Sequence, residues 1–478
     1  MLTETSPASR RWWALALIAI AQFMVIMDTS IIGVALPKIR ADLGFSQENL
    51  SWVFNAYVIA FGGLLLLGGR LSDLLGARRI FAAGWIVLLA GSVVAGAAGE
   101  IWLELTGRAL QGAGAALVAP SALTLLMMLF GGRPGELGKA LSLYGAAAPA
   151  GGTAGVFLGG VISEYISWPW VFYINIPFAL VALVASPALM PKGTARRGAT
   201  DLLGAVTVTA GLAVAVFAVV RAPEAGWGSV QTAGGLAIAV VLLGAFLAIQ
   251  ARRRHSLVRL GIFRTPNLGA ANLAQLLLGG AWIPMWYFLN LYLQQVLGLG
   301  AFASGSALVP MTTVIMLIMV AIAPRLAARW GAKAMIVSGL AVLALGLVWL
   351  SLVRPTGTYW VDVLPASLVA ATGMALAFVP SLGTAMSSAR PEEGGLASGI
   401  VNTSYQVGSA LGLAAMTALA TSLGANELGD AAALTTGQSA AFLGAAGIAA
   451  VGALVAGVTL RGRRAQGADT TNAASTHA

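Results

Sequence analysis

The chain has 478 residues, of which 58% are hydrophobic and only 9% are charged, and its mean hydropathy is +0.87. Soluble domains carry about 25% charged residues, so this composition excludes a soluble globular protein and indicates an integral membrane protein. The formal net charge of +10 does not by itself indicate a nucleic-acid partner, because the meaning of a basic composition depends on where the charges lie.

Fourteen apolar stretches are long enough to form transmembrane helices, since about 20 residues cross the hydrocarbon core of a bilayer. They are apolar on every side, whereas the strands of a membrane barrel alternate over about 10 residues, so the sequence predicts an all-α integral membrane protein. An even number of spans places both termini on one side. The predicted spans are residues 12–36, 51–68, 80–98, 101–129, 137–161, 168–190, 202–220, 230–250, 268–295, 303–323, 334–353, 361–386, 397–421 and 437–460.

The positive charges identify that side as the cytoplasm, because cytoplasmic loops are enriched in Lys and Arg. Of the 27 Lys and Arg residues, 22 lie in the tails and in the loops on the side of the termini. The opposite loops hold only Lys38, Arg40, Arg221 and Arg354, and Arg108 lies within a span. Both termini are therefore predicted to be cytoplasmic, and no nucleic-acid partner is needed to explain the basic composition.

The first span contains a single acid, Asp28. A carboxylate inside a bilayer costs about 2.5–3.5 kcal/mol on insertion scales, so this side chain is expected to face the interior of a helix bundle or water. Counted from the outer ends of their helices, Asp28 and Arg108 both lie about 10–12 Å deep. If the two helices adjoin, these charges can pair or share a cavity.

Such a pair can bind and release a proton, because burial favours the neutral acid whereas a guanidinium favours the carboxylate. A movement of Arg108, or of a cationic substrate, relative to Asp28 would then switch proton binding. The alternative is a permanent structural ion pair.

The turn between the second and third spans combines glycines with charges at the cytoplasmic side. The glycines permit a tight turn, and the acid stands among arginines, which suggests a latch that forms in one conformation only. Ordinary enrichment of positive charge in a cytoplasmic loop is the alternative. The turn, GRLSDLLGARR, contains Gly69, Asp73, Gly76, Arg78 and Arg79.

The two ends of the chain resemble each other. The pair Gly151 and Gly155 recurs 257 residues later as Gly408 and Gly412. The turn after the second span recurs at an offset of 255, with Ala328 in the place of Asp73. Repeats of this kind place a substrate site near the membrane midplane, between two halves that rock.

The repeat predicts two six-helix bundles with two helices inserted between them. The predicted domains are a cytoplasmic tail at 1–11, the N-terminal bundle at 12–190, two linker helices at 202–250, the C-terminal bundle at 268–460 and a disordered cytoplasmic tail at 461–478.

Several of these motifs resemble those of a known family. The turn at residues 69–79 resembles the signature loop of the major facilitator superfamily, and residues 108–114 resemble its R-x-x-Q-G motif. In the fifth span, the glycines resemble the antiporter motif G-x-x-x-G-P-x-x-G-G, with Val156 in the place of its proline. These glycines are Gly151, Gly155, Gly159 and Gly160.

Two further segments, residues 28–37 and 168–177, resemble motifs of the fourteen-span drug:proton antiporters of the EmrB/QacA type, although Pro169 stands where that family usually has Arg. The resemblance implies the major facilitator fold, with two six-helix bundles plus two inserted helices. It also implies proton-coupled export of drugs or other small organic compounds by alternating access, with Asp28 and Arg108 as the proton-coupling residues.

A proton-coupled symporter that imports a nutrient or metabolite is the alternative function. An enzyme is not expected, because the sequence has neither a Walker-type phosphate loop nor a credible catalytic triad. No cofactor or metal site is expected either, because there is no cysteine and the two histidines lie in a loop and a tail. The expected setting is a monomer in the bilayer of a bacterial inner membrane, with protons and a small organic substrate as partners.

Polar and aromatic residues within the spans are candidates for the substrate cavity, although helix–helix hydrogen bonding is as good an explanation for each. Glu104 and Asp362 lie near the outer ends of their spans and are expected to be hydrated, with cation binding as the alternative. The cavity candidates are Gln22, Asn55, Tyr57, Gln111, Asn175, Tyr287, Asn290, Asn402, Tyr405 and Gln406.

Overall fold

The computed structural model describes residues 8–45, 52–192, 202–226, 228–252, 265, 267–390, 393–425, 427 and 429–461. The predicted disorder of the C-terminal tail concerns residues that lie, apart from Arg461, outside this described part. In the described part the regular structure is helical, as the apolar runs of about 20 residues predict.

Each of the fourteen predicted spans falls on one helix or on consecutive helical segments. The first half of the chain forms α1 (Ala8–Leu43), α2 (Trp52–Leu75), α3 (Ala77–Gly96), α4 (Ile101–Phe130), α5 (Pro134–Tyr165), α6 (Trp170–Tyr173) and α7 (Asn175–Leu189). The middle forms α8 (Leu202–Ala225) and α9 (Val230–Arg252). The second half forms α10 (Leu268–Leu291), α11 (Ala301–Ala307), α12 (Val309–Leu317), α13 (Ala323–Leu350), α14 (Leu364–Ser388), α15 (Gly394–Ser422) and α16 (Ala431–Thr459), with π-helical segments η2 (Tyr292–Val296), η3 (Ile318–Ile322) and η4 (Tyr359–Val363).

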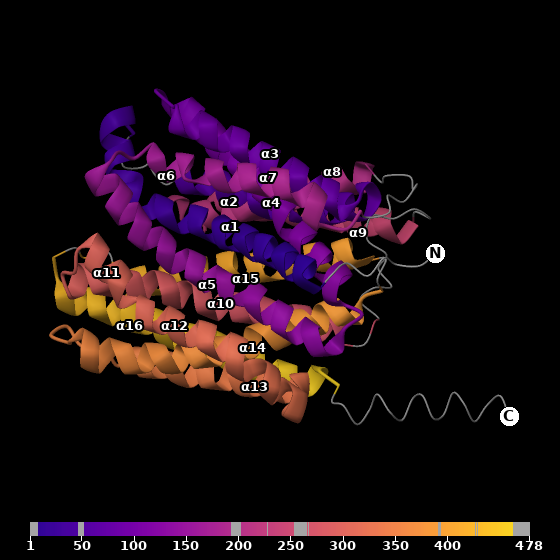
Figure 1. Ribbon diagram of the computed structural model, residues 1–478. Helices are drawn as coiled ribbons and strands as arrows, with labels where there is room; N and C mark the ends of the chain where they lie inside the picture. Colours follow the sequence, from indigo (N-terminus) through magenta and orange to yellow (C-terminus); the bar gives the residue numbers. More distant parts are fainter. Residues whose placement is uncertain are drawn as a thin grey trace.

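Eleven helical stretches of the described residues are long and apolar enough to cross a membrane. One of them, Phe302–Leu350, contains two predicted spans that meet at Gly331, where φ is +81° and the helix bends. Helix α8 contains a shorter apolar segment, Val206–Val219. Helix α15 lies among the spanning helices in the middle of the bundle (Figure 1).

The helices of the two halves lie side by side, and each half uses the same packing pattern (Figure 1). In the first half α1 packs on α5 and α3 packs on α4, and in the second half α10 packs on α15 and α13 packs on α14. Helix α8 packs against α2 and α15, one helix from each half, and α9 covers α8. The inserted helices therefore line the seam between the halves rather than separating them.

Glycines bring the paired helices into close contact, as small residues do in membranes. A Cβ at Gly151 or Gly155 of α5 would collide with the backbone of α1. The same is true of Gly408 and Gly412 of α15 against the backbone of α10. The repeated glycine pairs therefore occupy equivalent helix contacts in the two halves.

Helix α1 is longer than its predicted span, since it continues through Pro37 to Leu43. Two side chains attach this extra segment to neighbouring elements. The Lys38 amine donates to the carbonyl of Ser163 at the end of α5, and Trp168 Nε1 donates to Asp42 Oδ2 over 2.6 Å. These tertiary contacts hold a helical end that local sequence rules would terminate at the proline.

Candidate functional site

Asp28 lies inside the first helical bundle and is only 1% exposed. Helix α1 packs against α4, α5 and α7, so this side chain faces neighbouring helices rather than lipid. The next two hydroxyls, Thr29 and Ser30, both donate to the Ile26 carbonyl of their own helix. The acid is therefore the residue of this segment that reaches across to other helices.

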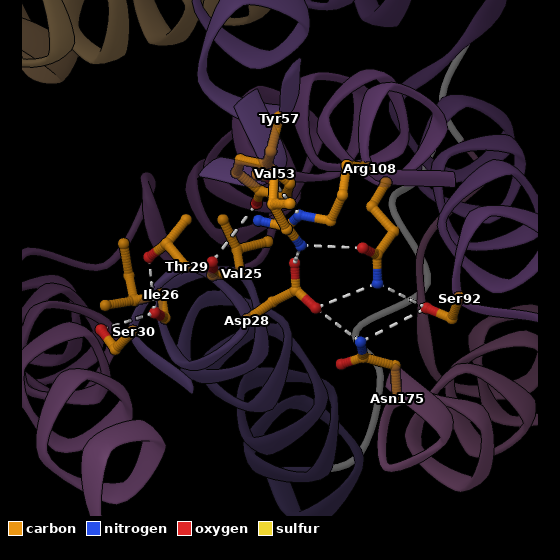
Figure 2. Close-up of polar contacts among 11 residues, drawn as sticks. Val25, Ile26, Asp28, Thr29, Ser30, Val53, Tyr57, Ser92, Arg108 and Asn175 are labelled. Atoms are coloured by element: carbon orange, nitrogen blue, oxygen red, sulfur yellow. Dashed lines mark hydrogen bonds and ion pairs between the residues drawn. The ribbon is translucent and has the colours of Figure 1, made fainter. Parts of the chain in front are cut away.

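Four side chains from three other helices form a hydrogen-bonded network with Asp28 (Figure 2). Arg108 Nη1 of α4 donates to Asp28 Oδ2 over 2.8 Å. Asp28 Oδ1 accepts from Gln111 Nε2 at 3.0 Å and from Asn175 Nδ2 at 2.7 Å. Both amides also donate to Ser92 Oγ of α3, at 2.9 and 3.3 Å.

Arg108 is fully buried and is held on several sides. Its Nε donates to the Val53 carbonyl over 2.9 Å, and its Nη1 also donates to Gln111 Oε1 over 2.8 Å. The guanidinium carbon lies 4.6 Å from the centroid of the Tyr57 ring, a cation–π distance. Its Nη2 atom has no hydrogen-bond partner among the described residues.

Every group that contacts the Asp28 oxygens is a hydrogen-bond donor, and one of these donors is a cation. A shift of α4 or α7 that withdrew these donors would leave the Asp28 carboxylate without hydrogen-bond partners in an apolar interior. Such a carboxylate would then take up a proton. The geometry can therefore couple proton binding to helix movement.

The hydration expected for Glu104 and Asp362 is not found. Glu104 is 0% exposed, and neither carboxylate oxygen has a hydrogen-bond partner among the described residues. Asp362 is bound by Arg354, whose Nε and Nη2 donate over 2.7 and 3.1 Å. These hydrogen bonds raise the pKa of the Arg354 guanidinium. The error arose because distance from a helix end does not say which way a side chain points.

Two of the predicted latch residues, Gly69 and Asp73, lie at the contact between the two halves. Asp73, at the end of α2, accepts hydrogen bonds from the backbone N–H groups of Gly395 and Leu396, over 2.7 and 2.9 Å. These groups belong to the first turn of α15, where the helix dipole favours a negative charge. The close approach requires glycine on both sides, because a Cβ at Gly69 would collide with the Gly395 carbonyl.

The rest of the turn follows from its glycine and its arginines. Gly76 has φ +93° and caps the start of α3, a conformation that glycine adopts most easily. Arg78 Nη1 donates to the carbonyls of Pro187 and Met190, where α7 ends, over 3.3 and 3.5 Å. Arg79 is exposed. Asp73 thus contacts the other half through helix N–H groups.

The second copy of the turn keeps the backbone but not the acid. Gly331 has φ +81°, which matches the left-handed conformation of Gly76. Ala328 stands in the place of Asp73, so this copy has no carboxylate to bind a helix start. The latch geometry is therefore present in one half of the repeat only.

The remaining glycines of the predicted antiporter motif differ in their surroundings. A Cβ at Gly159 would lie 2.8 Å from the Ile31 carbonyl, so this residue extends the α1–α5 contact. Gly160 has ample space, since its nearest neighbour would be Phe302 N at 3.9 Å. Val156, in the place of the motif's proline, packs beside Gly305 of α11.

Three of the ten cavity candidates belong to the Asp28 network, where Tyr57, Gln111 and Asn175 hold the acid and its arginine. Two others are bound to neighbours: Gln22 accepts from Tyr144 Oη over 2.8 Å, and Asn290 accepts from Gln294 Nε2 over 2.9 Å. The others are scattered. Asn55 is buried, Tyr287 is exposed, and Asn402, Tyr405 and Gln406 lie partly buried on α15.

One member of the site was missed from the sequence. Ser92 bridges Gln111 and Asn175, but a single serine in an apolar run gives no distinctive signal. Glu104 stands four residues before Arg108 and therefore shares its helix face, a relation that the sequence shows and that was not used.

Three comparisons with known proteins agree with one another. The model of the Major Facilitator Superfamily matches residues 18–413. A cephamycin export protein of Amycolatopsis lactamdurans is 39% identical over 450 residues, which are 93% of this chain and 91% of that protein. A puromycin resistance protein of Streptomyces alboniger is 37% identical over 428 residues, which are 89% of this chain and 84% of that protein. The solved structure of the proton:xylose symporter XylE is similar with a TM-score of 0.67 at 13% identity, over 94% of this chain and 95% of that chain.

Proposed function

Because this chain belongs to the major facilitator superfamily, we propose that it exports small organic compounds of the antibiotic type from the cell in exchange for protons. Family membership confirms the resemblance and the all-α membrane fold that the sequence predicted. The relatives named for cephamycin export and puromycin resistance support drug efflux as its function.

The observation that carries the proton-coupling part of the proposal is the buried Asp28–Arg108 pair, 2.8 Å apart and set within amide donors. Buried ion pairs are weak evidence for stability, because desolvation offsets their attraction. An ionisable group within a membrane span is therefore a functional candidate by default. Its contacts to α4 and α7, whose amides are bonded to Ser92 of α3, link its protonation to the packing of the first half.

In the proposed cycle a proton from outside binds Asp28, the substrate leaves, the two halves rock, and the proton is released to the cytoplasm. Asp73 and the start of α15 join the halves at the side where the positively charged loops lie. Breaking these two hydrogen bonds would open that side. The protein would work as a monomer in the bacterial inner membrane, with both termini in the cytoplasm.

The driving force depends on the charge of the substrate. Each charge that crosses the membrane contributes about 2.3 kcal/mol per 100 mV, and each pH unit contributes about 1.4 kcal/mol. Export of a neutral compound for one proton uses both contributions. Export of a monovalent cation for one proton uses only the pH gradient.

The test is Asp28→Asn, with Asp42→Asn as the matched control on the exposed outer end of the same helix. We expect Asp28→Asn to insert in the membrane but to lose proton-driven transport, because the amide cannot bind and release a proton. Antibiotic susceptibility in an efflux-deficient bacterium and drug uptake into inverted vesicles measure the effect. Proton-driven transport at the wild-type rate in Asp28→Asn would rule out this assignment.

Import by proton symport is distinguished by the direction of transport. The similarity to a proton:xylose symporter concerns the fold alone and does not separate the two functions. With an imposed pH gradient, an antiporter moves substrate against the proton flow, whereas a symporter moves both in the same direction.

A further inference from the structure

The buried acid on α4 has no role in the network around Asp28. Glu104 is 0% exposed, and both of its oxygens lack a hydrogen-bond partner among the described residues. A carboxylate buried in this way, without donors, would pay a large desolvation cost. The protonated carboxylic acid has a much smaller desolvation cost, because it carries no charge.

The segment of α4 that carries this acid packs against apolar residues. Its neighbours along α4, Ile101 and Leu105, pack against a cluster of buried residues from α1, α2, α3, α5 and the α6 region. This cluster contains Ile31, Ile32, Ala35, Ile39, Phe45, Val53, Ala95, Ile162, Trp168, Val171 and Phe172. An apolar environment of this kind selects the neutral form of an acid.

One cation lies within reach. Glu104 and Arg108 are four residues apart on α4, so their side chains share one face of the helix with Cβ atoms about 5–6 Å apart. Arg108 binds Asp28 through Nη1, while its Nη2 has no partner among the described residues. The charges that act on Glu104 are this guanidinium and the Asp28 carboxylate of α1; the other groups around the guanidinium, Tyr57 from α2 and Phe172, are uncharged rings.

We propose that Glu104 is a second proton-binding group of the transporter, which shares Arg108 with Asp28 and alternates with it in carrying one proton. The inference rests on the proposed proton antiport. In the conformation described here, Arg108 binds the ionised Asp28 and Glu104 carries the proton. In the alternative conformation, the Arg108 guanidinium leaves Asp28 and binds the ionised Glu104, which lies one helical turn away on α4. Asp28 then carries the proton.

The exchange balances in charge and in atoms. In both conformations the three groups comprise one guanidinium, one carboxylate and one carboxylic acid, so their net charge is zero. The step breaks the O–H bond of Glu104 and forms an O–H bond on Asp28. Because this exchange adds no charge to the buried interior, it avoids the electrostatic cost of holding an unpaired charge while the proton moves between the two acids.

The position of Glu104 also determines the order in which a proton from outside reaches the two acids. It lies in the first turn of α4, whereas Arg108 and Asp28 lie one turn deeper. A proton that arrives from the outer side therefore reaches Glu104 first and Asp28 second. This order fits an antiporter that is loaded with protons from outside.

The test compares Glu104→Gln with Glu100→Gln, in which the same change is made at an exposed acid just before α4. In infrared spectra of the purified full-length protein at neutral pH, the wild type and Glu100→Gln should show the carbonyl band of a protonated carboxyl group. Glu104→Gln should lack that band. Persistence of the whole band in Glu104→Gln would overturn the proposal.

Transport in proteoliposomes provides the second measurement. Glu104→Gln should lose proton-driven accumulation about ten-fold or more, which is the usual size of a coupling between sites. Substrate counterflow without a proton gradient should persist, because counterflow needs no net proton movement. If Glu104→Gln does not insert, Glu104→Asp keeps a carboxyl group and should restore coupling with an altered pH profile.

The two proposals fail in different ways. If transport by the wild-type protein does not depend on the proton gradient, the proposed antiport is contradicted. The infrared band would still show whether Glu104 carries a proton. Wild-type coupling together with an unchanged pH profile in Glu104→Gln would overturn the role of Glu104 alone.

Discussion

At the scale of single residues, the properties of Asp28 are set by its donors rather than by its own helix. The carboxylate accepts from one guanidinium and two amides that come from α4 and α7. Each amide is itself fixed by Ser92. Because hydrogen bonds to charged groups contribute about 1.5–3 kcal/mol each, the loss of a single donor should change the proton affinity of the site measurably.

Asn175→Leu removes one of these donors while keeping the side chain's size. Without this donor, one oxygen of the Asp28 carboxylate loses a hydrogen bond in the interior of the bundle. We therefore expect the midpoint of the pH profile of proton-driven transport to move to higher pH.

The control for this prediction is Asn272→Leu, a buried asparagine of the second half that donates within α10. It should leave the midpoint unchanged. A midpoint that moves to lower pH in Asn175→Leu, or moves equally in both variants, would contradict the proposed role of the amide.

At the scale of helices, the contact between α2 and α15 depends on the absence of side chains. Gly69 and Gly395 face each other so closely that a Cβ on either would collide with the other backbone. The contact also brings the Asp73 carboxylate to the N–H groups of Gly395 and Leu396. If the contact between α2 and α15 forms in only one conformation of the cycle, a substitution at this contact should change the transport rate more than it changes folding.

Gly395→Ala tests this contact, with Gly394→Ala as its neighbour and control. The two changes have the same effect on helix propensity, but a Cβ at Gly394 would meet only Thr124 Cγ2 at 3.8 Å. Overpacking at Gly395 should cost about 1–3 kcal/mol, which reduces the population of the joined state about 5- to 150-fold.

We expect Gly395→Ala to insert at the wild-type level but to transport more slowly, and Gly394→Ala to behave as the wild type. Equal transport by the two variants, at equal protein levels, would mean that the contact has no part in the cycle.

At the scale of the whole molecule, the distribution of charge and apolar surface determines how the bundle sits in a bilayer. Large apolar side chains are exposed on the outside of the helices, for example Val184 at 79% and Val458 at 86%. Such a surface is stable in lipid, where all backbone groups are bonded within the helices. From the basic loops we propose that both termini lie on the cytoplasmic side.

The absence of cysteine makes this topology directly testable. We expect Gly99→Cys, in the turn between α3 and α4, to react with a membrane-impermeant maleimide added to intact cells. Gly132→Cys, in the turn between α4 and α5, should react only after the cells are opened. A Cβ meets nothing within 4 Å at either position, so neither substitution should disturb folding. The reverse labelling pattern would invert the proposed orientation.

The sequence by itself determined the all-helical membrane fold, the repeated glycine pairs and the position of one acid within the first span. These features follow from apolar runs of bilayer length, from repeated glycine spacing and from the cost of burying a charge, all of which depend on short segments of chain. The equal depth of Asp28 and Arg108 was also readable, because depth along a helix is a matter of counting residues.

Tertiary structure alone decided which groups complete the site. Ser92 and the Val53 carbonyl join it from α3 and α2, Asp73 binds the N–H groups at the start of α15, and Glu104 is buried rather than hydrated. Each of these facts depends on the rotation of one helix against its neighbours. In a span that is apolar on every side, the sequence carries little information about that rotation, and close packing between helices fixes it.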